Sequence, residues 1–524
     1  MPKKPKSKRA RPKATAGLTA KRKPRRKRGR PRSAASPRPR SAAAAGGPDI
    51  LTWEDDPRSG APPVRRQAPD IAATSLPLAI QGAAPAVNIY SAGSPEFRYW
   101  NAAGALRRGA DFWAGILPPG TMWQRGGPLA VFLDEGVDLD AYYDRRSLSF
   151  FHDQVGTETI YSGESPDIIC HELGHAVLDA IRPQLWDAAS DEAAAFHESF
   201  GDITAILSGL QVPTFRAAVL TETGGHLYRN SRLSRIGEQL GRALNQRRPD
   251  KASPDALRNA SNSFFYSDPI MLPPTGPDSQ LTSQPHSFSR VFTGGFFDML
   301  SGILAVLSSV PTEDDLLQAS QDAGRLIVDA VGLAPVVPDY FSQVAAHVIK
   351  ADAARFSDKY GEVIKSAFVR RGILSLQSAA QPPPSAEPGF RAAAASSRRG
   401  TGARSGSKPA AAVSKMTLPG DAFGLGGKTL VVQAPVETRR LRVSAAAVDM
   451  GSAPRPTVDR ATRAFLEVLF RRGRVDFSKT KASVSRTLHP GIRKKTHELV
   501  ERRDGLHLER RIFDCGFDCG CPWP

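Results

Sequence analysis

The chain contains the pentapeptide His171-Glu172-Leu173-Gly174-His175, whose spacing is typical of a helix that binds a metal ion. In a helix, residues four apart lie on the same face, so the two histidines can bind one zinc ion together. Glu172 leaves the same turn and can take a proton from a water beside that ion. Ser165-Pro166 precedes the apolar run as a helix start signal. The motif therefore predicts a helical zinc site with a carboxylate base.

A second helical pattern, over residues 191–210, supplies the missing ligand. It carries Glu198 and, one turn later, Asp202. A catalytic zinc ion needs three protein ligands and one open position, so Glu198 is the predicted third ligand. Asp202 is predicted to accept a hydrogen bond from a ligand imidazole. The alternative is that Glu192, Glu198 and Asp202 form an ordinary solvated face.

The chain contains a natural comparison for the motif. His497-Glu498-Leu499-Val500 begins in the same way, but Glu501 stands where the second histidine would be. This copy lacks the metal-binding pair, and it predicts no site.

The ordered set of motifs resembles the thermolysin-like gluzincin zinc metallopeptidases. Their signature is HExxH followed by a helix bearing ExxxD, which matches His171 to His175 and then Glu198 to Asp202. The resemblance extends over about residues 85–373. Three further landmarks match in family order, and a closing helical region follows them: Asp140-Ala141-Tyr142-Tyr143, Leu257-Arg258-Asn259, His286-Ser287-Phe288-Ser289 and residues 339–373.

The resemblance implies a two-lobed α+β zincin fold, with a shortened β-containing N-lobe and a mainly helical C-lobe. It implies a zinc-dependent metalloendopeptidase that hydrolyses peptides or proteins. Glu172 would then be the general base and acid, and His286 would stabilise the oxyanion. Arg258 would hold a substrate carbonyl while pairing with Asp202. Asp140 and Ala141 would pair with the substrate backbone.

Three positions depart from the family pattern. Trp186 stands where the family places a tyrosine, and an indole N–H can only donate. The nearest aspartate before His286 is Asp278, which is further away than the family's orienting aspartate. Asp140 replaces an asparagine and brings a negative charge. These departures bear on efficiency and specificity.

Two residues next to the predicted metal ligands, His197 and Cys170, are not expected to bind the metal. His197 is next to Glu198 but points about 100° away on a helix, so a surface or supporting position is expected. Cys170 is expected to be a small buried apolar residue. No carboxylate cluster follows Asp202, so calcium is not implied.

Charge is distributed unevenly over the 524 residues. The net charge is +19, with +18 in residues 1–40 and +13 in residues 374–524. Residues 41–373 therefore carry −12, the difference from the total. An acidic body thus lies between two basic flanks.

The N-terminal tail lacks aromatic residues and apolar periodicity, so disorder is expected. Within it, Arg28-Gly29-Arg30-Pro31-Arg32 resembles an AT-hook, which inserts arginine into the minor groove of A·T-rich DNA. The alternatives are nonspecific binding of polyanions, docking on the acidic body, or no role. No signal peptide or membrane-spanning apolar run is visible, so an intracellular location is expected. The alternative is export by a route that needs no cleavable signal.

The remaining organisation is read from composition and pattern. Residues 40–85 are expected to be a linker, residues 86–151 to contain strands and a helix over 102–116, and residues 374–414 to be a second linker. The segment 415–524 is expected to form a small basic module of mixed α and β structure. Its predicted elements are strands at 429–432 and 441–443, a helix at 460–470 and a hairpin turning at Asp504-Gly505.

The module ends in Cys515, Cys519 and Cys521, which are too few for a closed zinc site. A disulfide with one free thiol, or no special role, are the alternatives. The main competing reading of the whole chain is a nucleic-acid- or scaffold-binding protein that retains a peptidase fold. The substrate and the oligomeric state are left open by the sequence.

Overall fold

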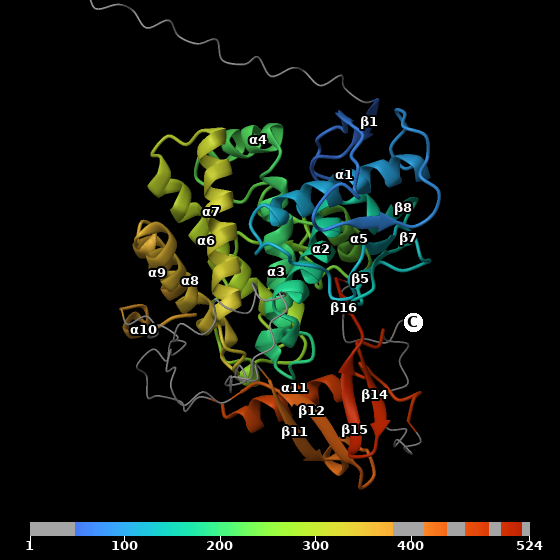
Figure 1. Cartoon of the computed structure of the whole chain (residues 1–524), viewed down its shortest axis with the longest axis vertical. Helices are drawn as coiled ribbons and strands as arrows, with labels where there is room; N and C mark the ends of the chain where they lie inside the picture. Colours follow the sequence, from blue (N-terminus) through green and yellow to red (C-terminus); the bar gives the residue numbers. More distant parts are fainter. Residues whose placement is uncertain (1–47, 381–412, 437–455, 481–493, 516–524) are drawn as a thin grey trace, which may run out of the picture. The chain divides into compact units, whose positions relative to one another are not determined.

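The computed structural model describes residues 48–380, 413–436, 456–480 and 494–515. The chain divides into two units, Met1–Gly46 and Gly47–Pro524. Every described residue belongs to the second unit, which mixes helices and strands as expected (Figure 1). The division into two lobes stays a prediction.

One five-stranded sheet runs through the body in the order β16-β5-β6-β4-β3. Strands β3, β4 and β6 are parallel, whereas β5 is antiparallel to β6 and β16 is antiparallel to β5. In β4, Leu129 and Val131 are buried, which fits the two-residue period of a strand. The strands are β3 (Leu78–Ile80), β4 (Leu129–Phe132), β5 (Ala141–Tyr143), β6 (Ser147–Phe150) and β16 (Phe513–Asp514).

The linker predicted for residues 40–85 is wrong from residue 48 onward. β1 (Asp49–Thr52) and β2 (Val64–Gln67) form an antiparallel pair, and β3 joins the main sheet. Ile50 is buried in the core, and the Thr52 hydroxyl donates to Asn101 Oδ1 at 3.0 Å. Tertiary burial of a few apolar residues therefore orders a segment whose composition is typical of a linker.

Helix α1 (Pro95–Ala114) begins seven residues before the predicted start at 102. The Ser94 side chain accepts a hydrogen bond from the Phe97 N–H, and Pro95 occupies the first turn. A proline there loses no helical hydrogen bond, so the helix can start at this point. Two short antiparallel pairs complete the strands of the body: β7 (His152–Val155) with β8 (Glu158–Tyr161), and β9 (Arg235–Ile236) with β10 (Arg258–Asn259).

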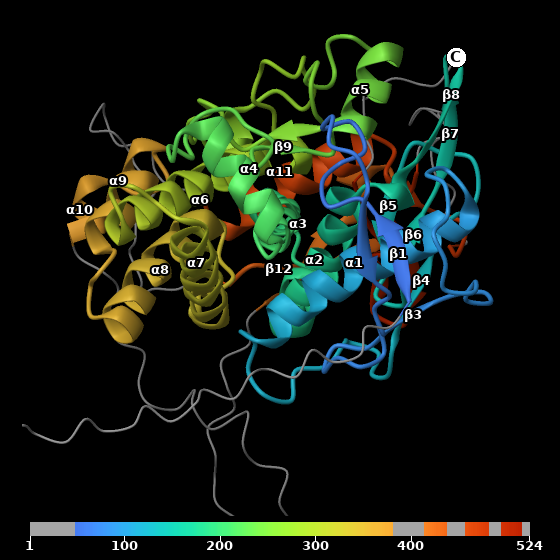
Figure 2. The same ribbon diagram turned by 90° about the horizontal axis from the view of Figure 1, so that it is seen from above.

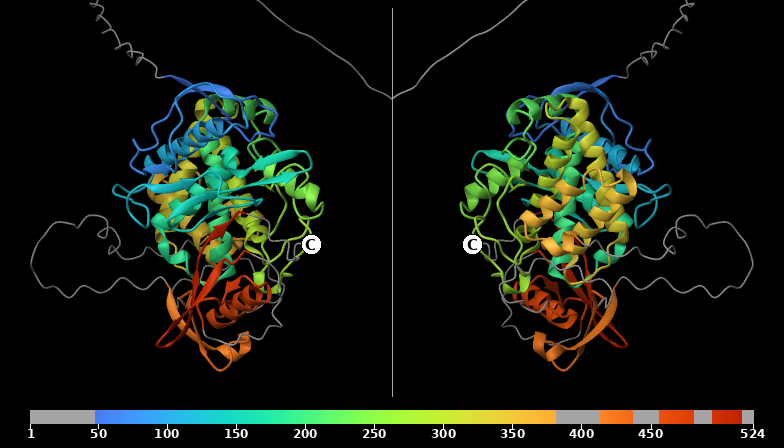
Figure 3. Two further views of the ribbon diagram at one scale, coloured as in Figure 1. Left: turned by 90° about the vertical axis from the view of Figure 1, so that its right-hand side faces the viewer. Right: turned by 90° about the vertical axis from the view of Figure 1, so that its left-hand side faces the viewer.

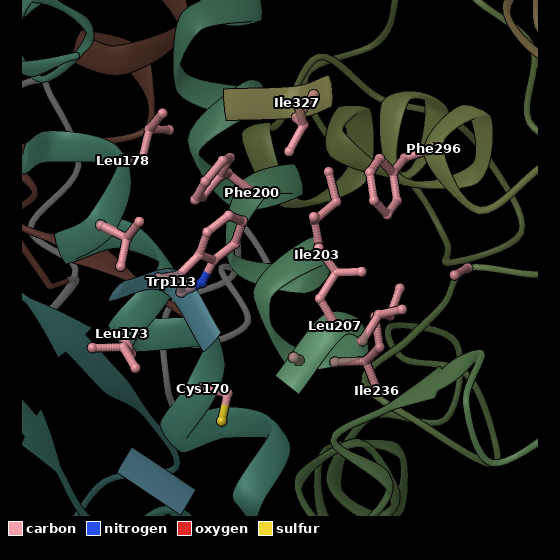
Figure 4. Close-up of a cluster of buried hydrophobic side chains, with 14 of the residues drawn as sticks. Trp113, Cys170, Leu173, Leu178, Phe200, Ile203, Leu207, Ile236, Phe296 and Ile327 are labelled. Atoms are coloured by element: carbon pink, nitrogen blue, oxygen red, sulfur yellow. The ribbon is translucent and has the colours of Figure 1, made fainter. Parts of the chain in front are cut away.

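Two buried helices, α2 (Pro166–Ile181) and α3 (Asp191–Gly209), pack against each other at the centre of the core. The predicted helix at 191–210 is thereby confirmed. Their apolar side chains interlock with those of α1 and α6 (Pro285–Leu307) in a continuous cluster (Figure 4). The cluster includes Trp113, Leu173, Leu178, Phe200, Ile203 and Phe296.

The helices within residues 285–380 lie together on one side of this pair, whereas the helix over residues 238–247 lies apart from them, beside β7 and β8 (Figures 1 and 2). Although the sequence suggested no spanning segment, α6 is long and apolar enough to cross a membrane by length and composition. Its most apolar window is 67% buried within the protein, as expected for a core helix. The other helices are α4 (Pro213–Thr223), α5 (Glu238–Arg247), α7 (Glu313–Leu333), α8 (Tyr340–Phe356), α9 (Gly361–Arg370) and α10 (Leu376–Ala380).

A second five-stranded sheet forms the C-terminal module, defined here as the described residues between 413 and 512. Its order is β11-β12-β15-β14-β13, and α11 (Val458–Arg471) shares its apolar core (Figure 3, orange to red). The hairpin predicted at Asp504-Gly505 is confirmed, whereas the strand predicted at 441–443 lies outside the described residues. The strands are β11 (Ser414–Pro419), β12 (Thr429–Ala434), β13 (Val475–Asp476), β14 (His497–Arg502) and β15 (Gly505–Arg510).

The predicted boundary between body and module is crossed by β16. This strand follows β15 along the chain but pairs with β5 of the body. Phe513 lies opposite Tyr143, and Asp514 lies opposite Tyr142. The module and the body are therefore joined by a shared sheet as well as by the chain.

Candidate metal centre

Helix α2 carries the motif into the interior of the protein. The Ser165 side chain caps its first turn by accepting from the Ile168 N–H, and Pro166 follows the cap. His171, Glu172 and His175 are each 0% exposed. Burying three ionisable side chains without partners is unfavourable in free energy, so the surrounding residues must provide compensating interactions.

Helix α3 approaches α2 closely because both helices have glycine at the contact. A Cβ atom on Gly174 would lie 2.8 Å from the Gly201 Cα atom. A Cβ atom on Gly201 would lie 2.5 Å from Cε1 of His171. The glycine inside the motif thus permits the helix contact, and Gly201 leaves space for the His171 ring.

Three side chains from these helices converge on one point. Oε2 of Glu198 lies 3.4 Å from Nε2 of His171 and 3.8 Å from Nε2 of His175. All three of these atoms are buried and lack a hydrogen-bond partner, as do both carboxylate oxygens of Glu172. Buried polar atoms are normally satisfied, so a convergent unsatisfied set indicates an absent partner. Two imidazoles and a carboxylate suit zinc, and the residues therefore fit that ion.

Asp202 and Arg258 support this set from behind. Oδ1 of Asp202 lies 3.0 Å from Nδ1 of His171, which leaves Nε2 pointing toward Glu198. The Arg258 guanidinium pairs with the same carboxylate, with its Nε at 2.9 and 3.0 Å from the two oxygens. This is the arrangement expected for a ligand histidine held by a hydrogen-bonded carboxylate. The solvated face considered for Glu192, Glu198 and Asp202 is excluded, because all three are buried.

The electrostatics of the cluster reflect its burial. Burial and the nearby Arg258 oppose charge on His171, but the carboxylates of Asp202 and Glu198 beside the ring outweigh them and raise its pKa to about 9. Burial raises the pKa of Glu172 to about 8 and lowers the pKa of His175 well below its usual value. A bound cation would compete with these protons, because it binds only deprotonated ligands.

His286 reaches the same point from the first turn of α6. Its Nε2 atom lies 3.3 Å from Oε2 of Glu198 and 2.5 Å from the carbonyl oxygen of Asp514. Asp278, considered as its orienting aspartate, pairs instead with Arg290 at 2.8 Å. The backbone carbonyl of Asp514 is therefore the hydrogen-bond partner that this ring has in the structure.

Asp140, Ala141 and Trp186 also lie beside the cluster, but their polar groups have partners within the chain. Asp140 forms an ion pair with Lys494, and the Ala141 carbonyl accepts from the Cys515 N–H at 2.9 Å. The Trp186 indole N–H donates to the Arg510 carbonyl at 3.2 Å. The three residues predicted to lie beside a substrate therefore pair with residues from the C-terminal part of the chain.

Of the surface and supporting positions considered for His197, the structure shows the supporting one: the residue is fully buried, and its Nδ1 atom lies 3.2 Å from Nδ1 of His175. Sequence reasoning missed two further residues at the site. The Phe513 ring stacks on His197 with centroids 3.9 Å apart, and Cys515 is 1% exposed and interacts with Glu172. The cysteine was visible in the sequence, but nothing local links it to residue 172. Arg28, Gly29, Arg30, Pro31, Arg32, Cys519 and Cys521 lie outside the described residues.

Comparisons with known proteins add little to this geometry. No protein-family model and no curated protein sequence matches the chain. Among solved structures, the chain is similar to the precursor of protealysin, a metalloproteinase from Serratia proteamaculans. The match has 16% identity and a TM-score of 0.36, and it covers 64% of this chain and 91% of that one.

Proposed function

We propose that the chain is a zinc-dependent metallopeptidase that hydrolyses peptide bonds. One observation carries the proposal: the unsatisfied atoms of His171, His175 and Glu198 converge in a buried site, with an unsatisfied carboxylate, Glu172, beside them. Ligands of this kind suit zinc, and an adjacent free carboxylate suits a general base. The three residues would hold the ion.

Glu172 performs the proton transfers in this mechanism. A zinc ion in the site would supply a Lewis acid that activates water and polarises a carbonyl. The Glu172 carboxylate takes a proton from the attacking water and passes it to the leaving amine.

His286 and Arg258 are the proposed partners of the substrate. The His286 Nε2 atom already contacts a peptide carbonyl, that of Asp514, and can donate to the oxyanion that develops during hydrolysis. Arg258 remains charged because it is paired with Asp202, and its guanidinium can hold a substrate carbonyl. Ala141 on β5 and Asp140, which directly precedes this strand, would align an extended substrate by backbone pairing.

The test compares Glu172→Gln with Glu498→Gln, which makes the same change in the incomplete copy of the motif. Each substitution is made both in the full chain and in a chain that ends at Arg510. All four proteins are assayed for bound zinc and for casein cleavage. We expect Glu172→Gln to keep its zinc and lose at least ~10²-fold in cleavage rate. Glu498→Gln should be unchanged in both. Cleavage unaffected by Glu172→Gln, or insensitive to chelation, would overturn the proposal.

We propose a second, separate partner for the basic tail. Its +18 charge in residues 1–40 suits a polyanion, and Arg28 to Arg32 suit A·T-rich DNA. The test measures how binding of A·T and G·C duplexes by the full chain depends on salt, with and without these five residues replaced by alanine. It distinguishes general polyanion binding from a preference for A·T-rich DNA. Equal binding of both duplexes at every salt concentration excludes the A·T preference.

A further inference from the structure

The C-terminal segment Phe513–Cys515 lies where a substrate strand is expected. It pairs antiparallel with β5, the strand that would otherwise be the edge of the body's sheet. The Cys515 N–H donates to the Ala141 carbonyl at 2.9 Å. Adding an extended peptide to a free sheet edge is a common mode of peptide recognition.

The Phe513 ring, the Asp514 carbonyl and the Cys515 thiol lie against residues of the candidate metal centre. The Phe513 ring stacks on His175 as well as on His197, with interplanar angles of 19° in both pairs. The Asp514 carbonyl accepts from His286, and the buried Cys515 side chain interacts with Glu172. The segment thus reaches both proposed catalytic residues.

Little space remains in the site while the segment is present. A cavity of about 60 Å³ is lined by Glu198, His286 and Phe513 among others. A second cavity of about 30 Å³ is lined by Arg258, His286 and Cys515 among others. Sites for small ligands have volumes of about 300–1,000 Å³, so neither cavity admits a peptide.

The module holds the segment and the neighbouring body residues through three basic side chains. Arg474 forms two hydrogen bonds with the Asp514 carboxylate, at 2.8 and 3.0 Å. Lys494 pairs with Asp140, and its ammonium group lies 4.7 Å from the centre of the Tyr142 ring. The Arg510 Nε–H donates to the Trp186 carbonyl at 2.9 Å. Folding of the module therefore holds the segment in register with β5.

We infer that the β5 edge is a peptide-binding groove whose resident ligand is the chain's own segment Phe513–Cys515, which makes the C-terminal module a tethered inhibitor. The occupant is specific, because its aromatic ring, its Asp514 carbonyl and its Cys515 N–H each have a partner in the groove. The inference rests on the proposed function for its consequence, but the binding can be tested without any cleavage. A tethered peptide acts at an effective concentration in the millimolar range, so a free peptide competes poorly with it.

The first experiment measures binding. A fluorescein-labelled peptide with the sequence of residues 511–515 is titrated into the full chain and into a chain ending at Arg510, and anisotropy is recorded. We expect binding to the shortened chain to be at least tenfold tighter than to the full chain. The same peptide with alanine in place of Phe513 should bind the shortened chain more weakly. Equal affinity for the two chains, or no binding to a folded shortened chain, overturns the inference.

The second experiment keeps the full chain, in case the shortened one does not fold. Cys515→Pro removes the N–H that pairs with Ala141, whereas Cys515→Ser keeps it and is the matched control. We expect Cys515→Pro to bind the labelled peptide at least tenfold more tightly than the unaltered chain and Cys515→Ser to remain much closer to it. Peptide binding by Cys515→Pro that equals that of the unaltered chain overturns the inference.

Cleavage assays separate this inference from the proposed function. Peptide binding that responds as expected, with no cleavage by any chain, supports the resident ligand and refutes the peptidase. Equal cleavage by the full and shortened chains, with equal peptide binding, supports the peptidase and refutes the resident ligand.

Discussion

Replacing Gly201 with alanine is predicted to damage the metal centre without altering a ligand. The new Cβ atom would lie 2.5 Å from Cε1 and 2.6 Å from Nδ1 of His171. Carbon atoms make favourable contact at about 3.5–4.0 Å, so the ring must move by roughly 1 Å. The His171 ring is fully buried and hydrogen-bonded to Asp202, so it has little room to move.

The displacement is large compared with what a zinc ligand tolerates. Zinc–nitrogen distances of about 2.0–2.1 Å vary by only about 0.2 Å in a sound site. Disturbing the groups that orient a ligand typically lowers metal affinity about 10–100-fold, which corresponds to about 1.4–2.8 kcal/mol. We expect a loss in that range for Gly201→Ala. Overpacking lowers the free energy of unfolding by roughly 1–3 kcal/mol. The higher helix propensity of alanine offsets about 1 kcal/mol of this loss.

The assay is competition for zinc against a chromophoric chelator, with thermal unfolding followed in parallel. Gly332→Ala on α7 is the matched control, because a Cβ atom there would meet nothing within 4 Å. It should bind zinc normally and be equally or slightly more stable. Wild-type zinc affinity in a folded Gly201→Ala variant would refute the argument that this glycine makes space for His171.

Three further predictions follow from the contacts of single residues. Asp202→Asn removes the charge between His171 and Arg258, so zinc affinity should fall about 10–100-fold in the same competition assay. Burial raises the pKa of Asp55 to about 7. The folded state therefore keeps a proton that the unfolded state loses above about pH 4, and stability falls as pH rises from about 4 to 7. At pH 8 the free energy of unfolding of Asp55→Asn should exceed that of wild type by up to roughly 4 kcal/mol, so the variant should unfold at a higher temperature. At pH 4 the two proteins should unfold at similar temperatures. Equal unfolding temperatures at pH 8 contradict this prediction. Lys494→Ala removes the ion pair with Asp140 and should increase binding of the labelled peptide to the full chain, whereas Lys479→Ala, which removes only a pair within the module, should not.

Local sequence features predicted the central helices well. The Ser165-Pro166 start and the four-residue spacing of the histidines are properties of a single helix, and α2 has both. Helix α3 covers the predicted range for the same reason. Residues 48–85 show the opposite case, because their strands are ordered by contacts with α1 and the main sheet that composition does not reveal.

The site could be predicted only in part. The family-like order of motifs suggested that Glu198, Asp202, Arg258 and His286 belong with α2, and the structure brings their side chains together. Their roles in catalysis stay predictions. The partners of Asp140 and Trp186 were not foreseeable, because Lys494 and Arg510 lie 354 and 324 residues away along the chain.

The two histidines and the neighbouring carboxylate could be recognised from local spacing alone, because the period of one helix places them on the same side. The occupant of the adjoining groove could not be recognised in this way. Phe513–Cys515 is too short to show a strand period, and it carries no signal that names β5 as its partner. Strand pairing depends on backbone hydrogen bonds between segments that folding brings together, so this contact is visible only once the chain has folded.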